Sequence, residues 1–170
     1  MNKLQIIWEG FLLVAFWALL WVVVIAFSPS ARAEGYVPEK YQAMLNGVLE
    51  KQPVEWNLER QFTYKDIEDA FDSTPNLILR PDEFEYFATP LEFEANGGDC
   101  EDVSIWRAYE LAKKGTGRLE LYIGNQGYSS HAVLVATDDK GVQWVLDNLV
   151  RYPYKLKHLD MQVVYKLEII

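Results

Sequence analysis

The stretch from residue 97 to residue 114 reads GGDCEDVSIWRAYELAKK, and it decides the fold of this protein. Apolar side chains recur at helical spacing between Val103 and Ala112, and two lysines followed by Gly115 are typical of a helix end. The stretch therefore predicts an amphipathic helix that begins at Cys100, the only cysteine in the chain. A thiol in the first turn of a helix lies near unpaired backbone N–H groups, whose partial positive charge favours the thiolate. Cys100 is thus a candidate nucleophile.

Helical segments precede this stretch, and β-rich segments follow it. The helices are expected at 38–51 and 64–71. The strands are expected at 118–123, 131–137, 142–146 and 162–170. Helices first and then an antiparallel meander is an α+β layout, in which the nucleophile helix packs on an antiparallel sheet.

Capping and turn residues refine this picture. Thr63 precedes the helix at 64–71, and Asp66 follows three residues later, which is a variant of the capping box. Between residues 73 and 98 the helical pattern degrades, because prolines, including Pro90, interrupt short apolar clusters. We expect a long ordered connection without a helix there.

His131 opens one predicted strand, and Asp147 follows the next. If the loop between these strands has an odd number of residues, either 138–140 or 139–141 with a left-handed glycine, both side chains share one face of the sheet. They then lie directly opposite or one diagonal step apart, whereas an even loop separates them. In the functional interpretation Asp147 accepts a hydrogen bond from the His131 ring and fixes its tautomer. The alternative interpretation is a polar residue at a sheet edge and a residue that caps a turn.

Three acidic residues, Asp99, Glu101 and Asp102, flank the cysteine. Their negative charge should raise the pKa of the Cys100 thiol, so a catalytic site here needs something that neutralises them. A bound hard cation would do so, and an oxygen-rich cluster suits calcium. The alternative is that these acids only stabilise the helix N-terminus. Zinc is disfavoured, because one cysteine and two histidines do not easily close a zinc site.

Residues 11–27 form an uninterrupted apolar run, so 1–33 is predicted to be a signal peptide or an N-terminal membrane anchor. An Ala-x-Ala pattern at Ala31 and Ala33 favours cleavage, whereas the length of the run favours retention as a membrane span. Both alternatives place a single domain, 34–170, outside the cytoplasm.

The sequence has a formal net charge of −9. This balance argues against a nucleic-acid partner, because binding phosphates needs a basic surface. It is compatible with cation binding and with a soluble surface.

Four short strings carry a resemblance to a known family. They are YFATPLEF at 86–93, GDCED at 98–102, SHAVL at 130–134 and LDN at 146–148. In order, spacing and context they resemble the bacterial transglutaminase-like cysteine peptidases, of which the LapG-type periplasmic proteases are the best known. The chain departs from the family pattern at Phe87, where tryptophan is frequent.

The resemblance implies a papain-like, transglutaminase-like cysteine protease core with a triad of Cys100, His131 and Asp147. It also implies calcium near the nucleophile, onto which Asp99, Glu101 and Asp102 map. It further implies a periplasmic endopeptidase that cleaves a large surface adhesin and is held by an inner-membrane cyclic-di-GMP receptor. Two other functions stay open: acyl transfer or deamidation on the same fold, and an inactive domain that binds a partner.

Overall fold

A computed structural model of the protein describes residues 39–75 and 86–169. The predicted signal peptide or anchor at 1–33 lies outside the described residues. Within the described ranges, no helix is both long enough and apolar enough to cross a membrane.

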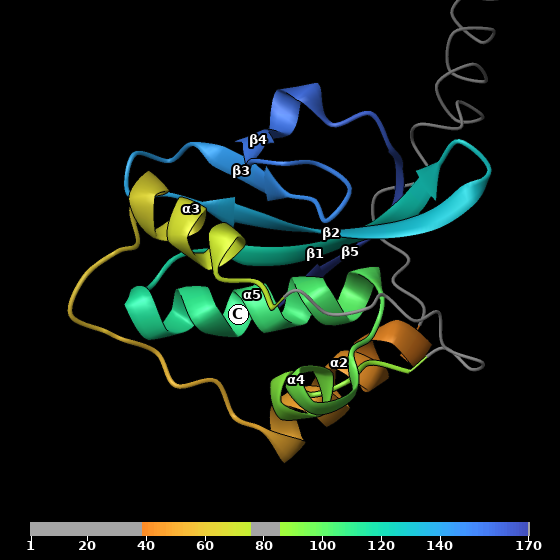
Figure 1. Cartoon of the computed structure of the whole chain (residues 1–170), viewed down its shortest axis with the longest axis horizontal. Coiled ribbons are helices and arrows are strands. Elements are labelled where there is room, and N and C mark those ends of the chain that lie inside the picture. Colours follow the sequence, from red (N-terminus) through yellow and green to blue (C-terminus); the bar gives the residue numbers. More distant parts are fainter. Residues whose placement is uncertain (1–38, 76–85, 170) are drawn as a thin grey trace, which may run out of the picture. The chain divides into compact units, whose positions relative to one another are not determined.

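The described part of the chain contains helices followed by strands, as the sequence predicts (Figure 1). The helices are α2 (Glu39–Lys51), α3 (Tyr64–Asp72), α4 (Pro90–Asn96) and α5 (Cys100–Lys114). The strands are β1 (Leu119–Gln126), β2 (Ser129–Thr137), β3 (Gln143–Leu146), β4 (Tyr154–Lys155) and β5 (Gln162–Glu168), with a short 3-10 helix, Leu156–His158, after β4. The α+β fold class is confirmed.

All neighbouring strands in the five-stranded sheet are antiparallel, and their order is β4-β3-β2-β1-β5. The expected simple meander holds only from β1 to β4. The chain then crosses back, and β5 pairs with β1 at the far edge. The local pattern predicts the last strand correctly but contains no information about its neighbour.

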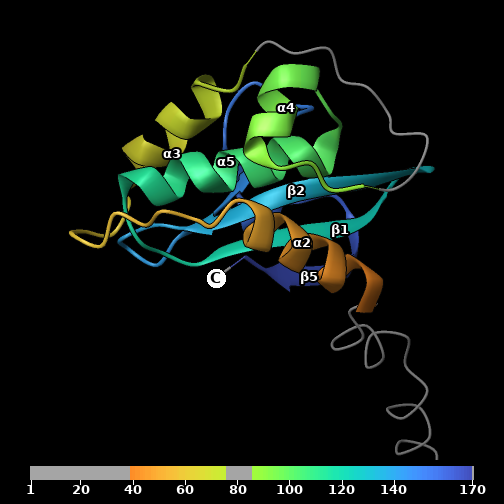
Figure 2. The ribbon, with the colours of Figure 1, turned by 90° about the horizontal axis from the view of Figure 1, so that it is seen from below.

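The helix α5 packs along one face of the sheet, and the main core lies between them (Figures 1 and 2). Successive strand residues point to opposite faces. On β2, Leu134 therefore joins the core under α5, while Val133 and Val135 pack on the opposite face, where Leu156 and Leu159 cover them. The two clusters together bury both faces of β2, the strand that carries His131.

The helix α4 corrects the expectation that 73–98 contains no helix. Thr89 caps its N-terminus by accepting a hydrogen bond from the Glu92 backbone N–H, and the Glu92 carboxylate accepts from the Thr89 backbone N–H. Pro90 occupies the first turn, where a proline needs no hydrogen-bond partner and its fixed φ suits a helix. The proline that suggested an interruption is therefore a start signal. Residues 76–85 lie outside the described residues.

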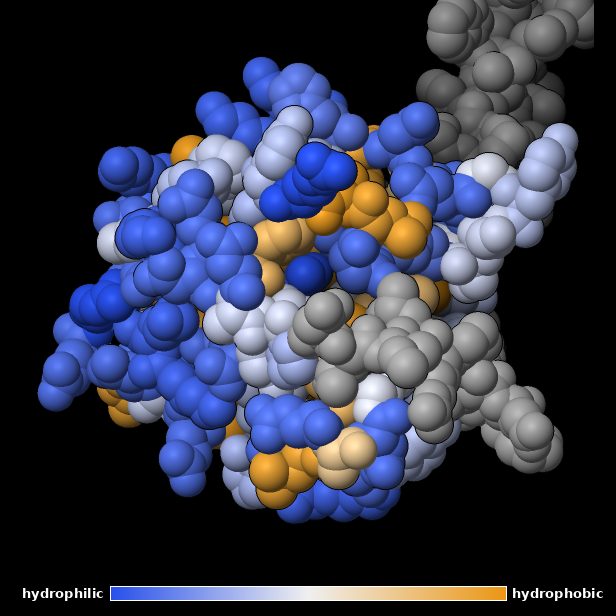
Figure 3. Space-filling view, in the orientation of Figure 1, coloured by the Kyte–Doolittle hydropathy of each residue, from blue (hydrophilic) through white to orange (hydrophobic). Residues whose placement is uncertain are grey.

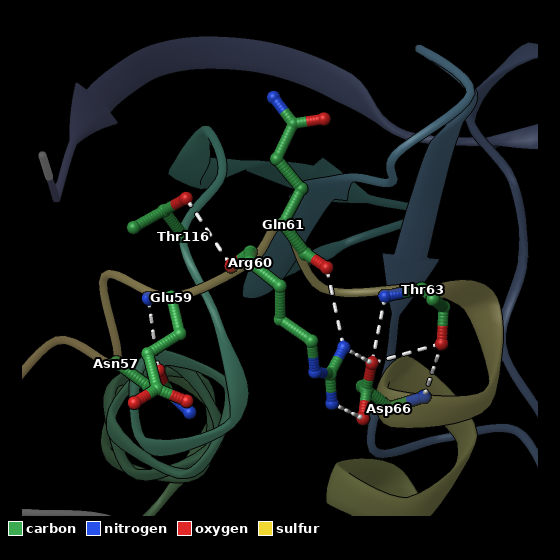
Figure 4. Close-up of polar contacts among 7 residues, drawn as sticks. All are labelled: Asn57, Glu59, Arg60, Gln61, Thr63, Asp66 and Thr116. Atoms are coloured by element: carbon green, nitrogen blue, oxygen red, sulfur yellow. Dashed lines mark hydrogen bonds and ion pairs between the residues drawn. The ribbon is translucent and has the colours of Figure 1, made fainter.

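The N-terminus of α3 has the predicted capping box (Figure 4). The Asp66 carboxylate accepts from the Thr63 backbone N–H at 2.7 Å, and the Arg60 guanidinium donates to both of its oxygens at 2.7 and 2.8 Å. These bonds lower the pKa of Asp66 well below its usual range, with the Arg60 hydrogen bonds as the largest cause. The network therefore holds the N-terminal end of α3 to the segment that precedes it.

Candidate active site

Cys100 occupies the first turn of α5, half-buried against the sheet. Close packing surrounds this turn, because a Cβ added to Gly98 would lie 2.2 Å from an Asp102 carboxylate oxygen. The glycine therefore lets the chain approach the helix start. Burial and the Glu101 charge raise the pKa of the thiol, and the Ala132 backbone N–H of β2 partly opposes this rise, so the sulfur lies next to the strand that carries His131.

The hairpin between β2 and β3 brings His131 and Asp147 together. The Asp138 backbone N–H donates to the Val142 carbonyl at 3.0 Å, which leaves a three-residue loop, 139–141, and Gly141 has a φ of 74°. This is the odd loop with a left-handed glycine, one of the two alternatives that place both side chains on one face. The His131 Nε2 lies 2.9 Å from the Asp147 Oδ1. The predicted histidine–carboxylate contact is confirmed.

Asp147 is almost completely buried, with 1% of its surface exposed. Burial by itself raises the pKa of this carboxyl, but hydrogen bonds from His131, from the Leu149 backbone N–H and from the Tyr154 hydroxyl outweigh it and hold the pKa below its usual value. An ionised carboxylate only accepts hydrogen bonds. His131 therefore carries its proton on Nε2, and its Nδ1 is the nitrogen left for proton exchange.

A cavity of about 530 Å³ opens beside these groups. Cys100 and His131 both line it, together with the tip of the β1–β2 hairpin and the loop that follows β3. Leu149 on this loop is 63% exposed. Figure 3 shows that the face seen in Figure 1 carries a patch of apolar surface bordered by hydrophilic residues. A molecule that enters the cavity therefore meets both the thiol and the imidazole.

The thiol is not yet poised as a nucleophile in this structure. Burial and then the negative charge of Glu101 raise the pKa of Cys100 to about 12. The Cys100 sulfur lies 3.3 Å from the Glu101 Oε2, to which the thiol donates a hydrogen bond. The acidic neighbour thus favours the protonated thiol, as the sequence predicts.

Two of the three predicted acidic ligands come together at the thiol. One carboxylate oxygen each of Asp99 and Glu101 lies within 4.8 Å of the other and of the Cys100 sulfur. Burial, followed by the neighbouring Asp99, raises the pKa of Glu101 to about 9. The Asp99 Oδ1 is buried and has no hydrogen-bond partner among the described residues. A pair of crowded carboxylates with an unpartnered oxygen fits a hard divalent cation.

Asp102, the third predicted ligand, is not part of this group. Its Oδ1 accepts from the Ala88 backbone N–H at 2.7 Å, and its Oδ2 accepts from the Asp99 backbone N–H at 3.1 Å. Asp102 therefore ties the helix start to the chain before α4. Its assignment as a metal ligand stays a prediction.

No protein-family model matches the chain, and no curated protein matches it in sequence. Solved structures of Legionella pneumophila LapG do match. One is 20% identical with a TM-score of 0.55 and covers 74% of this chain and 70% of that chain. An EGTA-treated LapG is also 20% identical with a TM-score of 0.55, covering 74% and 68% of the two chains. A calcium-bound LapG is 18% identical with a TM-score of 0.55 and covers 81% of each chain.

These likenesses define the fold. The chain shares its fold with the LapG structures, the proteins to which the four short strings showed a resemblance.

Two side chains near Asp147 were not identified from the sequence. Tyr154 donates its hydroxyl to the Asp147 Oδ2 at 3.4 Å, and no local pattern singled out this tyrosine. Arg107 lies buried in α5 next to the end of β3. A signal for Arg107 did exist, because a charged residue seven positions after Cys100 falls on the same side of the helix.

Proposed function

We propose that this protein is a thiol endopeptidase that uses Cys100 as nucleophile, His131 as general acid and base, and Asp147 as the group that orients the imidazole. The observation that carries the proposal is the cavity that both Cys100 and His131 line, with the His131 ring hydrogen-bonded to a buried, ionised Asp147. A cysteine, a histidine and an orienting carboxylate are the parts that activated-thiol catalysis needs.

The reaction follows from these groups. The Cys100 sulfur attacks the scissile carbonyl carbon after its proton passes to the His131 Nδ1. His131 then gives this proton to the leaving amine, and the C–N bond breaks. A water molecule, deprotonated by His131, attacks the thioester, releases a carboxylic acid and restores the thiol. Backbone N–H groups at the start of α5, including that of Cys100, are suited to stabilise the oxyanion.

Calcium is the proposed cofactor, with the Asp99 and Glu101 carboxylates as ligands and Asp102 as a further candidate. When bound, the ion supplies positive charge that neutralises the acidic cluster beside the thiol. The chain's own contribution is the pair of crowded carboxylates and the unpartnered Asp99 oxygen. One of the LapG structures that match this chain is calcium-bound, which supports calcium as the ion.

We further propose that the protein works in the periplasm, exported or anchored by its N-terminal segment 1–33. Its substrate is then a large surface adhesin, and its regulator an inner-membrane cyclic-di-GMP receptor. These assignments rest on the motif resemblance.

The test compares the full-length protein with its Cys100→Ala variant. Each is incubated with calcium and with surface proteins of the cell that produces it, and new peptide N-termini are identified by mass spectrometry. We expect new N-termini with the parent protein and none with Cys100→Ala. Isopeptide cross-links or glutamine-to-glutamate conversions in place of new N-termini would assign acyl transfer or deamidation. Cleavage at the parental rate by Cys100→Ala would contradict a thiol mechanism.

A further inference from the structure

The buried cation Arg107 lies on α5, next to the end of β3 that precedes Asp147. Arg107 on α5 is only 4% exposed. Its Nε donates to the Thr74 Oγ1 at 2.8 Å, and its guanidinium carbon lies 4.2 Å from the centroid of the Phe71 ring. Phe71 belongs to the last turn of α3, where the helix dipole favours a positive charge. Arginine is almost never buried without such partners.

Another hydrogen bond of this guanidinium reaches the end of β3, directly before Asp147. The Arg107 Nη1 donates to the Leu146 carbonyl at 3.2 Å. This carbonyl belongs to the peptide group that joins Leu146 to Asp147. The hydrogen bond therefore reaches the backbone that carries the proposed orienting acid.

The position of Asp147 depends on such contacts, because the sheet ladder ends before it. The last paired residues of β2 and β3 are Leu134 and Leu146, and Asp147 follows the final pair. Beyond that point its backbone has left the strand pairing. Arg107 holds the junction from the side of α5, the same helix that carries Cys100.

The positive charge of Arg107 also acts on Asp147, in addition to the hydrogen bond to the Leu146 carbonyl. Burial lowers the pKa of Arg107 to about 10, while the negative charge of Asp147 opposes that shift. Arg107 therefore remains a cation at neutral pH and favours an ionised Asp147. An ionised carboxylate accepts the hydrogen bond that the His131 ring N–H donates.

We infer that Arg107 is a positioning residue, which acts through Asp147 to hold the His131 ring in the orientation that serves the thiol. The inference rests on the proposed function, because it gives Asp147 the role of orienting acid. It makes one helix responsible both for the nucleophile and for the placement of the acid.

The test is a double-mutant cycle on the reactivity of the thiol. Because the chain has a single cysteine, the rate of alkylation by iodoacetamide reports on Cys100 without background. The full-length protein is measured in calcium at neutral pH as the parent, Arg107→Met, Asp147→Asn and the double variant. We expect Arg107→Met to slow alkylation by about three- to tenfold, which lies within the coupling energies found for residues in one hydrogen-bond network, and to have no further effect in the Asp147→Asn background.

Arg60→Met is the matched control. Arg60 also holds one end of α3 through hydrogen bonds, but its partner is Asp66, in a network separate from Asp147 (Figure 4). Its substitution should lower stability without changing the alkylation rate of the folded protein in either background. Arg107→Lys, which keeps the charge, should recover part of the parental rate.

The outcomes separate the two hypotheses. If Asp147→Asn leaves the alkylation rate unchanged, the proposed role of Asp147 fails. If Asp147→Asn slows alkylation but Arg107→Met has no effect, or slows it equally in both backgrounds, the role of Arg107 is wrong. If Arg107→Met does not fold, Thr74→Val, which removes the acceptor of the Arg107 Nε, replaces it in the same cycle.

Discussion

At the scale of single residues, the acidic neighbours of Cys100 disfavour the thiolate that the proposed mechanism needs. The Glu101 carboxylate accepts a hydrogen bond from the Cys100 thiol, and its charge helps to raise the pKa of that thiol to about 12. Three adjacent acids in the sequence predicted this conflict, but not how it is arranged. Neighbouring helix residues point in different directions, so Glu101 faces the thiol while Asp102 turns to the Ala88 and Asp99 backbone.

Replacing Glu101 with glutamine should make the thiol more acidic. Removing the carboxylate removes a charge that favours the protonated sulfur, so the pH at which Cys100 becomes reactive should fall. The measurement is the iodoacetamide alkylation rate against pH in EGTA. The control is Glu110→Gln near the other end of α5, which should leave the pH profile unchanged. A profile for Glu101→Gln that coincides with that of the parent would contradict the contact.

At the scale of secondary-structure elements, features that depend on adjacent residues could be predicted from the sequence, whereas the pairing of strands across the sheet could not. The capping box at Thr63 was predicted because it depends on a few adjacent residues. The parity of the β2–β3 loop stayed open in the sequence, and the structure shows the odd alternative. The helix α4 was missed because Pro90 was interpreted as an interruption, although a threonine before it and a glutamate at Glu92 complete a capping box. The short strand β4 and the pairing of β5 with β1 depend on distant contacts, which no local pattern encodes.

Two glycine substitutions with opposite expected effects on stability test the loop that brings Asp147 beside His131. Gly141→Ala should destabilise the protein by about 1 kcal/mol, because an L-residue is strained at a φ of 74°. Gly47→Ala in α2 should stabilise it by about 0.5 to 1 kcal/mol, since a Cβ there meets no atom within 4 Å and alanine favours the helix. Urea unfolding measures both changes. An equal effect of the two substitutions would show that Gly141 is not held in a left-handed conformation.

At the scale of the whole molecule, α5 connects the groups of the proposed site. Its N-terminus presents Cys100 and the acidic pair, its middle holds Arg107 beside the end of β3, and its side packs on the sheet that carries His131. The order of these groups in the sequence was sufficient to predict the fold class. Their convergence required the sheet register, which sets the distance between His131 and Asp147.

Calcium should stabilise this whole unit. A ligand that binds only the folded state adds about 2.7 kcal/mol at a concentration 100 times its Kd. We expect a Tm several degrees higher in calcium than in EGTA, and a much smaller difference for a variant with both Asp99→Asn and Glu101→Gln. Differential scanning calorimetry measures both. Identical melting curves of the parent protein in calcium and in EGTA would remove the calcium proposal.

Sulfur, imidazole and carboxylate should work as one unit once the acidic pair is neutralised. A crystal structure of the calcium-loaded protein would show whether they do. We predict that the ion contacts Asp99 and Glu101, and that the Cys100 sulfur lies within about 4 Å of the His131 Nδ1, close enough for proton exchange in a resting enzyme. A calcium-loaded structure in which the thiol still donates to Glu101 and the His131 ring faces away from the sulfur would contradict the account.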